Sequence, residues 1–143
     1  MKQAIVLAAL ILSVALSSCS YKDDFYGDFI MGGTQVEIDG RFTKGTKVRI
    51  PARLYNLPVT SIGKRAFYRY ELTSVRIPGS VTYICDEAFR HNQLTSVHIP
   101  GNVSYIEAGA FQDNKLTNVS VPRGTSVHPK AFDEWVTVTR RWW

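Results

Sequence analysis

A tandem repeat constrains this chain more than any other feature of its sequence. Residues 72–89 read LTSVRIPGSVTYICDEAF, and LTSVHIPGNVSYIEAGAF follows 22 residues later at 94–111. A copy one residue shorter stands at 116–132, and a copy with extra loop residues stands at 47–67. A short period of this kind is typical of solenoids, in which each repeat contacts only its neighbours.

One repeat has the pattern of a single coil made of two short strands and a turn. Pro78 and Gly79 end the first strand, because proline has no N–H to donate and glycine permits the bend. A helical or 3₁₀ turn closes the coil before Asn92, a residue type that tolerates left-handed geometry and can bond nearby backbone. The inward-facing residues expected from this pattern are Leu72, Val75, Ile77, Val81, Ile84, Ala88 and Phe89.

One coil cannot fold alone, because the apolar area of seven such residues does not offset the entropy of ordering 22 residues. Stacked coils share a continuous core, and the open ends of a short array must be covered. At the N-terminal end we expect a β-hairpin that pairs 34–38 with 46–50 around the turn residues between them. At the other end we expect a last strand at 134–139. The three tryptophans there either plug the last coil or touch a membrane or partner; they are Trp135, Trp142 and Trp143.

The repeated signature LTSVxIPxxVTxIxxxAFxxN resembles the BspA-like, or Treponema pallidum-type, leucine-rich repeats. The departures are small: Tyr70 replaces the asparagine of the first copy, and Val121 replaces an isoleucine. The resemblance implies a mainly β fold, namely a right-handed solenoid with a parallel sheet on its concave face, short 3₁₀ or helical turns and an N-terminal hairpin cap. It also implies a surface or secreted protein, often an adhesin or a host-matrix binder.

The N-terminus has the layout of a secretory leader. Lys2 precedes an apolar run, and the segment Leu16-Ser17-Ser18-Cys19 resembles a bacterial lipobox, in which the chain is cut before the cysteine and the cysteine is lipidated. The alternative is a plain signal peptide. The expected organisation is a leader at 1–18, a tether at 19–28 and a repeat domain at 29–143, the last comprising a hairpin cap at 34–50, repeats at about 47–136 and a C-terminal cap at 135–143.

The second cysteine, Cys85, stands at a turn position of the repeat. The other copies have Gly63, Glu107 and His128 there. A nucleophile needs a fixed partner that acts as a base, and a position that accepts four unrelated residue types does not supply one. We therefore favour a structural role for Cys85 over a redox or catalytic one.

No pattern in the sequence indicates catalysis, a metal or a cofactor. The three histidines, His91, His98 and His128, lack the spacing of a metal pair, and the chain has no CxxC. The adjacent carboxylates at 86–87 and 133–134 point apart on their turns, which disfavours a paired acid and base. The net charge of +5 is modest and no basic run exceeds two residues, which argues against nucleic acid as a partner.

The repeated strand offers two columns of outward side chains. The first column is Lys47, Ser74, Ser96 and Asn118, and the second is Arg49, Arg76, His98 and Ser120. We predict that Lys47, Arg49, Arg76 and His98 meet an acidic patch on a protein or glycan. The alternative is a solvated face without a ligand.

A second candidate surface lies on the opposite side of the coil. Tyr83 and Tyr105 hold equivalent positions in consecutive copies, where the flanking copies have Ser61 and Ser126. The two rings could form an aromatic recognition strip, but we favour packing under the turn.

The sequence therefore predicts a non-enzymatic, macromolecule-binding lipoprotein of the bacterial envelope. It would be anchored to the outer membrane through Cys19 and would act as a cell-surface adhesin or interaction module. The alternative is a periplasm-facing scaffold lipoprotein that contacts other envelope proteins. The sequence names neither the partner nor the oligomeric state.

Overall fold

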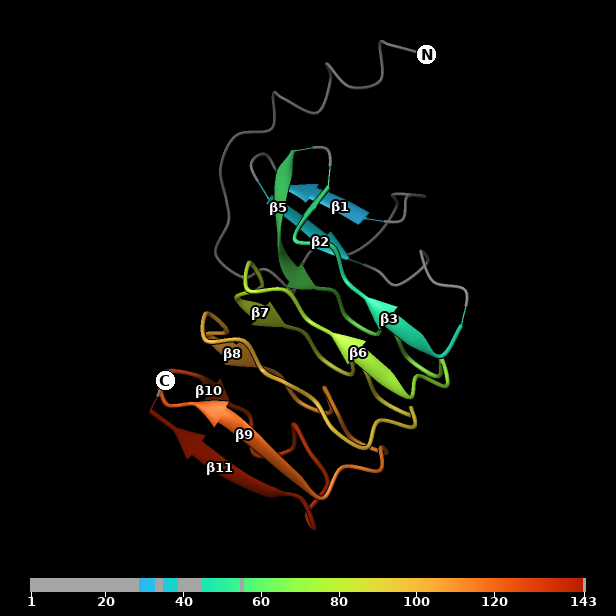
Figure 1. The fold of residues 1–143 in the computed structure, drawn as a ribbon, viewed down its shortest axis with the longest axis vertical. Helices are drawn as coiled ribbons and strands as arrows, with labels where there is room; N and C mark the ends of the chain where they lie inside the picture. Colours follow the sequence, from blue (N-terminus) through green and yellow to red (C-terminus); the bar gives the residue numbers. More distant parts are fainter. Residues whose placement is uncertain (1–28, 33–34, 39–44, 55, 143) are drawn as a thin grey trace.

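The computed structural model describes residues 29–32, 35–38, 45–54 and 56–142. In these residues, short strands joined by tight turns form coils that stack along the long axis of the molecule, without a helix (Figure 1). The expected leader at 1–18, the tether at 19–28 and Trp143 lie outside the described residues.

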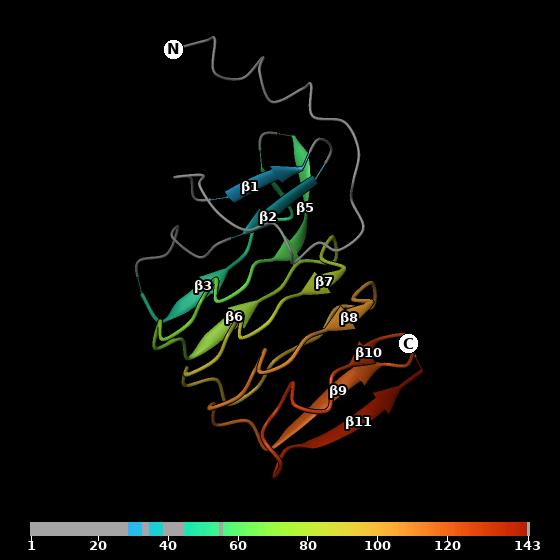
Figure 2. The same cartoon turned by 180° about the vertical axis from the view of Figure 1, so that it is seen from behind.

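Among the residues described, one sheet of seven strands lies on one side of the stack and two sheets of two strands each lie on the other, as Figures 1 and 2 show. The first sheet runs β1 (Phe29–Gly32), β2 (Gln35–Ile38), β5 (Leu57–Ile62), β7 (Tyr83–Ile84), β8 (Tyr105–Ile106) and β10 (Ser126–Val127), with β4 (Arg53–Leu54) beside β5. On the other side, β3 (Lys47–Arg49) pairs with β6 (Ser74–Arg76), and β9 (Asn118–Pro122) pairs with β11 (Thr137–Arg141). All pairs are parallel except β1 with β2 and β4 with β5. The parallel solenoid expected from the sequence is confirmed.

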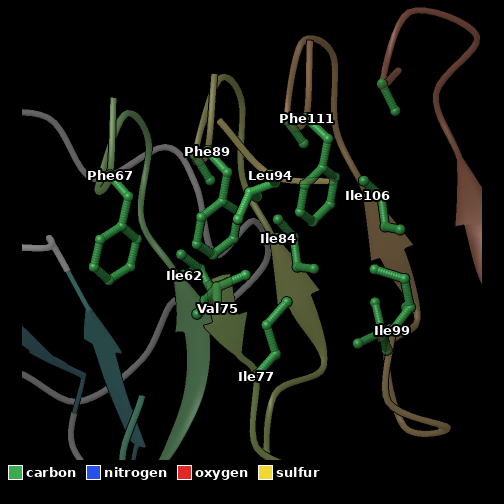
Figure 3. Close-up of a cluster of buried hydrophobic side chains, with 14 of the residues drawn as sticks. Ile62, Phe67, Val75, Ile77, Ile84, Phe89, Leu94, Ile99, Ile106 and Phe111 are labelled. Atoms are coloured by element: carbon green, nitrogen blue, oxygen red, sulfur yellow. The ribbon is translucent and has the colours of Figure 1, made fainter. Parts of the chain in front are cut away.

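A stack of phenylalanines runs through the core from coil to coil (Figure 3). Phe67, Phe89, Phe111 and Phe132 lie with neighbouring ring centroids 5.1, 5.1 and 5.3 Å apart and with nearly parallel planes. All four rings are buried, and the aliphatic side chains of both strands pack around them. Because each ring covers the next, the apolar surface of one coil is completed only by its neighbours.

Buried asparagines connect the same coils through their side-chain amides. The Asn92 Oδ1 accepts a hydrogen bond from the Leu72 N–H, and its Nδ2 donates to the carbonyl oxygens of Phe67 and Phe89. Asn114 repeats this arrangement one coil later, with Leu94, Phe89 and Phe111 as its main partners. These amides satisfy main-chain groups at the turns that strand pairing does not reach.

The left-handed residue of each turn is the one before the asparagine. His91 has φ of 57° and Asp113 has φ of 56°, whereas Asn92 and Asn114 are not among the left-handed residues. The expected hydrogen-bonding role of Asn92 is thus confirmed, but its expected left-handed backbone is not. A second left-handed position recurs at Arg65, Glu87 and Gly109. The segments expected to be helical or 3₁₀ turns are hydrogen-bonded turns and contain no helix in the described residues.

The N-terminal hairpin differs from the one expected. β2 pairs antiparallel with β1, from Phe29 opposite Ile38 to Gly32 opposite Gln35. The expected pairing of 34–38 with 46–50 is wrong, because β3 instead pairs in parallel with β6. The physical reason is that Val48 and Ile50 are buried in the core as part of the repeat pattern, which commits this strand to the next coil.

The C-terminal end also departs from expectation. The last strand is β11 at 137–141, three residues later than expected at its start, and it lies parallel to β9. Trp135 and Trp142 are 66% and 72% exposed, so their side chains do not fill the end of the core. Instead the Arg140 guanidinium donates to the carbonyl oxygen of Thr125 at 2.5 Å, and Arg141 donates to that of Ile99. Arginine side chains of the C-terminal end thus satisfy one carbonyl group of the last coil and one of the coil before it.

The strand face is the outer surface formed by β3, β6, residues 95–99, β9 and β11. Its ladder is interrupted in the middle coil. Within the described residues, no main-chain hydrogen bond joins 95–99 to the neighbouring strands. Val97 is accordingly half-buried, whereas the equivalent Val75 and Val119 are buried. The strand face therefore consists of two paired strands at each end and an unpaired extended segment between them.

The asparagine ladder leads to a stability prediction. We expect Asn92→Ala to lower the free energy of unfolding by about 3 kcal/mol, because it leaves the buried Leu72 N–H and two buried carbonyl groups without partners. Urea denaturation checks this. Gln93→Ala, at the exposed neighbouring residue, is the matched control and should change the free energy by less than about 0.5 kcal/mol. Equal effects of the two substitutions would contradict the assigned role of Asn92.

The interrupted ladder leads to a prediction for hydrogen exchange. The amides of residues 96–98 should exchange at least about tenfold faster than the Thr73 amide, which donates to the Thr46 carbonyl at 2.7 Å. Hydrogen–deuterium exchange read by NMR at single residues measures the two sets. Comparable protection of both sets would mean that the middle coil is paired in solution.

Candidate ligand-binding face

The two columns predicted from the sequence lie side by side on the strand face. Lys47 is in register with Ser74, and Arg49 is in register with Arg76. At the far end Asn118 is opposite Thr137, and Ser120 is opposite Thr139. The register therefore confirms both columns at the two ends of the face. β11 extends the columns by Thr137 and Thr139, which the sequence analysis did not include. That strand lacks the Ile-Pro or Val-Pro pair that ends the strand in the other copies, since Arg140-Arg141 stands there.

The cations at the N-terminal end of the strand face are exposed and uncompensated. Lys47, Arg49, Arg76 and His98 are all exposed, and among the described residues none of them forms an ion pair or a side-chain hydrogen bond. Arg49 and Arg76 stand on hydrogen-bonded strands, about 4.8 Å apart. Two unpaired arginines at this spacing repel each other in the free protein, and an anion relieves that repulsion.

No outward position of the strand face carries a carboxylate. The two columns contain only Lys, Arg, His, Ser, Thr and Asn from β3 to β11. This feature was visible in the sequence, because reading the outward positions of every copy together is enough to find it. The two columns are therefore cationic at their N-terminal end and carry only hydroxyl and amide groups at their C-terminal end.

Three acidic residues of the coils, Asp86, Glu87 and Asp113, lie instead on the turns, where cations pair with them. Lys64 pairs with Asp86 at 3.0 Å, Arg65 with Glu87 at 2.5 Å, and Arg90 with Asp113 at 2.8 Å. Arg90 also contacts Glu87, so this ion-pair ladder spans three coils. Positive and negative charge are thus separated, with the paired charges on the turns and the unpaired cations on the strand face.

Glu87 is the centre of this ladder, and its protonation is perturbed. The hydrogen bond from Arg65 lowers the pKa of the Glu87 carboxyl, burial opposes this, and the hydrogen bond from Arg90 adds to the lowering. The pKa of the Arg90 guanidinium is raised in turn by its hydrogen bonds to Asp113 and Glu87. The lowered pKa favours the ionised form of Glu87, whose charge is paired with Arg65 and Arg90 on the turns.

The tyrosine pair is brought together as expected. Tyr83 and Tyr105 are register partners in the first sheet, and their rings stack with centroids 5.3 Å apart. Both side chains are half-buried, and burial raises the pKa of the Tyr83 hydroxyl, which lies 3.5 Å from Glu107. The recognition strip stays a prediction, because the stack also accounts for these rings as packing.

Cys85 is not a free thiol, and His91 and His128 make local contacts. Cys85 is completely buried, which fits the structural role favoured for it. His91 lies 3.4 Å from Asp113, and His128 accepts a hydrogen bond from the Lys130 N–H. In the part of the chain that the structure describes, no three His, Cys, Asp or Glu residues gather as metal ligands, and no helix could cross a bilayer.

A scan against family models matches residues 43–138 to the BspA type leucine-rich repeat region, a model of six repeat copies. The match spans more than half of the chain and contains every coil described above. The chain belongs to the BspA-type leucine-rich repeat family. The resemblance seen in the repeats is thereby confirmed, and this repeat class is typical of protein-interaction modules.

A solved leucine-rich repeat protein from Bacteroides ovatus is similar in structure, with a TM-score of 0.50 and 21% sequence identity. The alignment covers 82% of this BspA-type chain and 41% of that protein's chain, so the likeness bears on the fold alone. No curated protein matches the sequence.

The ion-pair ladder leads to a prediction for acid stability. Because the folded-state pKa of Glu87 is lowered, its stabilising effect is present above the unfolded value of about 4.3 and is lost as the pH falls through the folded value. We expect the unfolding free energy of the wild type to fall below about pH 4.5, and Glu87→Gln to flatten part of this decline. Urea denaturation at pH values from 6 to 3 measures the unfolding free energy of the wild type and of the variant. Glu71→Gln, at an exposed residue outside the ladder, should keep the wild-type slope.

Proposed function

We propose that this chain is a non-enzymatic binding lipoprotein that uses the strand face to bind an acidic macromolecule. The observation that carries this proposal is the set of three exposed, uncompensated cations Lys47, Arg49 and Arg76, followed in the next coil by the exposed His98, on a face without carboxylates. Binding to an array of this kind is electrostatically steered and depends on salt. The repeat family, which is typically non-catalytic, is consistent with binding as the whole activity.

The cellular context follows from the leader and not from the fold. The lipobox-like Leu16-Ser17-Ser18-Cys19 supports a lipid on Cys19, and the solenoid would then stand on a short charged tether at the outer membrane. On the outer side of that membrane the protein would act as an adhesin toward host matrix. On the periplasmic side it would act as a scaffold for other envelope proteins.

The binding proposal is tested by reversing charge on the strand face. Binding partners are first captured with the mature chain from matrix components and from envelope extract. We expect Arg49→Glu with Arg76→Glu to weaken binding at least about tenfold and to reduce its salt dependence. The control is Lys115→Glu with Lys130→Glu, which makes the same charge change at exposed positions outside the two columns. A partner that binds the double variant and the wild type equally well would remove the strand face as the binding site.

The anchor and its orientation are tested on intact cells. Cys19→Ala should abolish both the incorporation of labelled fatty acid and the cleavage of the leader before residue 19. Cys85→Ala should preserve both the labelling and the cleavage. Added protease should degrade a surface-exposed protein and leave a periplasmic one intact. Protection from protease would reject the adhesin and favour the scaffold, and labelling that survives Cys19→Ala would reject the anchor.

A further inference from the structure

The two columns of the strand face lack the groups that a folded protein partner usually needs. Protein interfaces depend on buried aromatic and apolar anchors, and serine and lysine are depleted in them. The outward columns contain no apolar or aromatic residue. The exposed large apolar side chains of the described residues are Trp135, Val138 and Trp142, and none of them belongs to the columns. A flat protein surface would thus find charge here but no anchor.

The polar groups of the face change in kind along the solenoid axis. Lys47, Arg49 and Arg76 supply charge over the first two coils, and His98 adds an imidazole in the third. Past them the columns continue as hydroxyl and amide groups only, on Asn118, Ser120, Thr137 and Thr139. A ligand that follows the columns therefore needs oxyanions and hydroxyl groups on the same chain.

Several of these hydroxyl groups are available to a ligand. Within the described residues, the side chains of Ser96, Ser120 and Thr137 make no hydrogen bond, and Ser96 and Thr137 are exposed. Each can donate one hydrogen bond and accept others. Arg49 and Arg76 supply planar guanidinium groups, which match the oxygens of an oxyanion in pairs.

We propose that the ligand of the strand face is an anionic polysaccharide that lies extended along the solenoid axis, across the strands. Its carboxylate or sulfate groups contact Arg49, Arg76 and their neighbours, and its hydroxyl groups contact the serine and threonine side chains of the later coils. This inference rests on the proposed function, since it names the class of acidic partner for the same face. Acidic peptides match the cations equally well, but they leave the hydroxyl half of the face unused.

The test compares probes that separate charge from sugar. Affinities of the full-length chain in detergent are measured at low salt for polygalacturonate, heparin, neutral dextran and poly-glutamate. We expect polygalacturonate or heparin to bind at least about tenfold more tightly than poly-glutamate, and dextran not to bind. Ser96→Ala, Ser120→Ala and Thr137→Val together should weaken polysaccharide binding about tenfold and change poly-glutamate binding less than twofold. Circular dichroism and the melting temperature establish that each variant is folded.

The outcomes separate this inference from the proposed function. If poly-glutamate binds as tightly as the polysaccharides, and the hydroxyl variant affects neither, the face reads charge alone and the polysaccharide inference is wrong while the proposed function stands. The same conclusion follows if no polysaccharide binds but a captured acidic protein does, in a manner sensitive to Arg49→Glu with Arg76→Glu. If that charge reversal leaves every affinity unchanged, both ideas fail.

Discussion

Contact between coils is the interaction on which the rest of this structure depends. The stacked rings of Phe67, Phe89, Phe111 and Phe132 exclude water along the whole axis, and the amides of Asn92 and Asn114 tie each turn to the one before it. Neither device is complete within one coil, because each ring stacks on a ring of a neighbouring coil and each amide also bonds to a carbonyl group of the coil before it. The domain therefore folds as an array or not at all, and its surface inherits the same repetition.

That repetition accounts for the separation of charge. Residues at equivalent positions of successive coils become spatial neighbours, so acids and bases on the turns pair across coils, as Arg65 does with Glu87. The same rule places Arg49 beside Arg76 on the strand face, where no acid occupies an equivalent position. An array thus concentrates whichever residue type recurs at one position of the repeat. On the strand face, the recurring residue is the unpaired arginine at positions 49 and 76. This concentration is what makes the strand face a binding surface in our proposal.

Much of this arrangement could be predicted from residues 72–89 and their copies. The inward residues, the registers of Arg49 with Arg76 and of Tyr83 with Tyr105, and the parallel pairing all follow once the period is known. The ends could not be predicted in the same way, because each end occurs once and has no copy to compare. The repeat pattern predicts that 34–38 pairs with 46–50, whereas β2 pairs with β1. Trp135 and Trp142 are exposed, and the Arg140 side chain donates to the Thr125 carbonyl group at that end.

The sequence by itself determined the coil, its core and the residues that face outward. The reason is that, with a fixed period, residues at equivalent positions of successive copies become neighbours in space. Only the tertiary structure decided where that period breaks down. It left residues 95–99 without ladder hydrogen bonds, gave the left-handed backbone to His91 instead of Asn92, and set the exposure of Trp135 and Trp142. These outcomes depend on how neighbouring coils fit together in space. Such a fit is a balance of packing and hydrogen-bond geometry that a pattern of residue types does not contain.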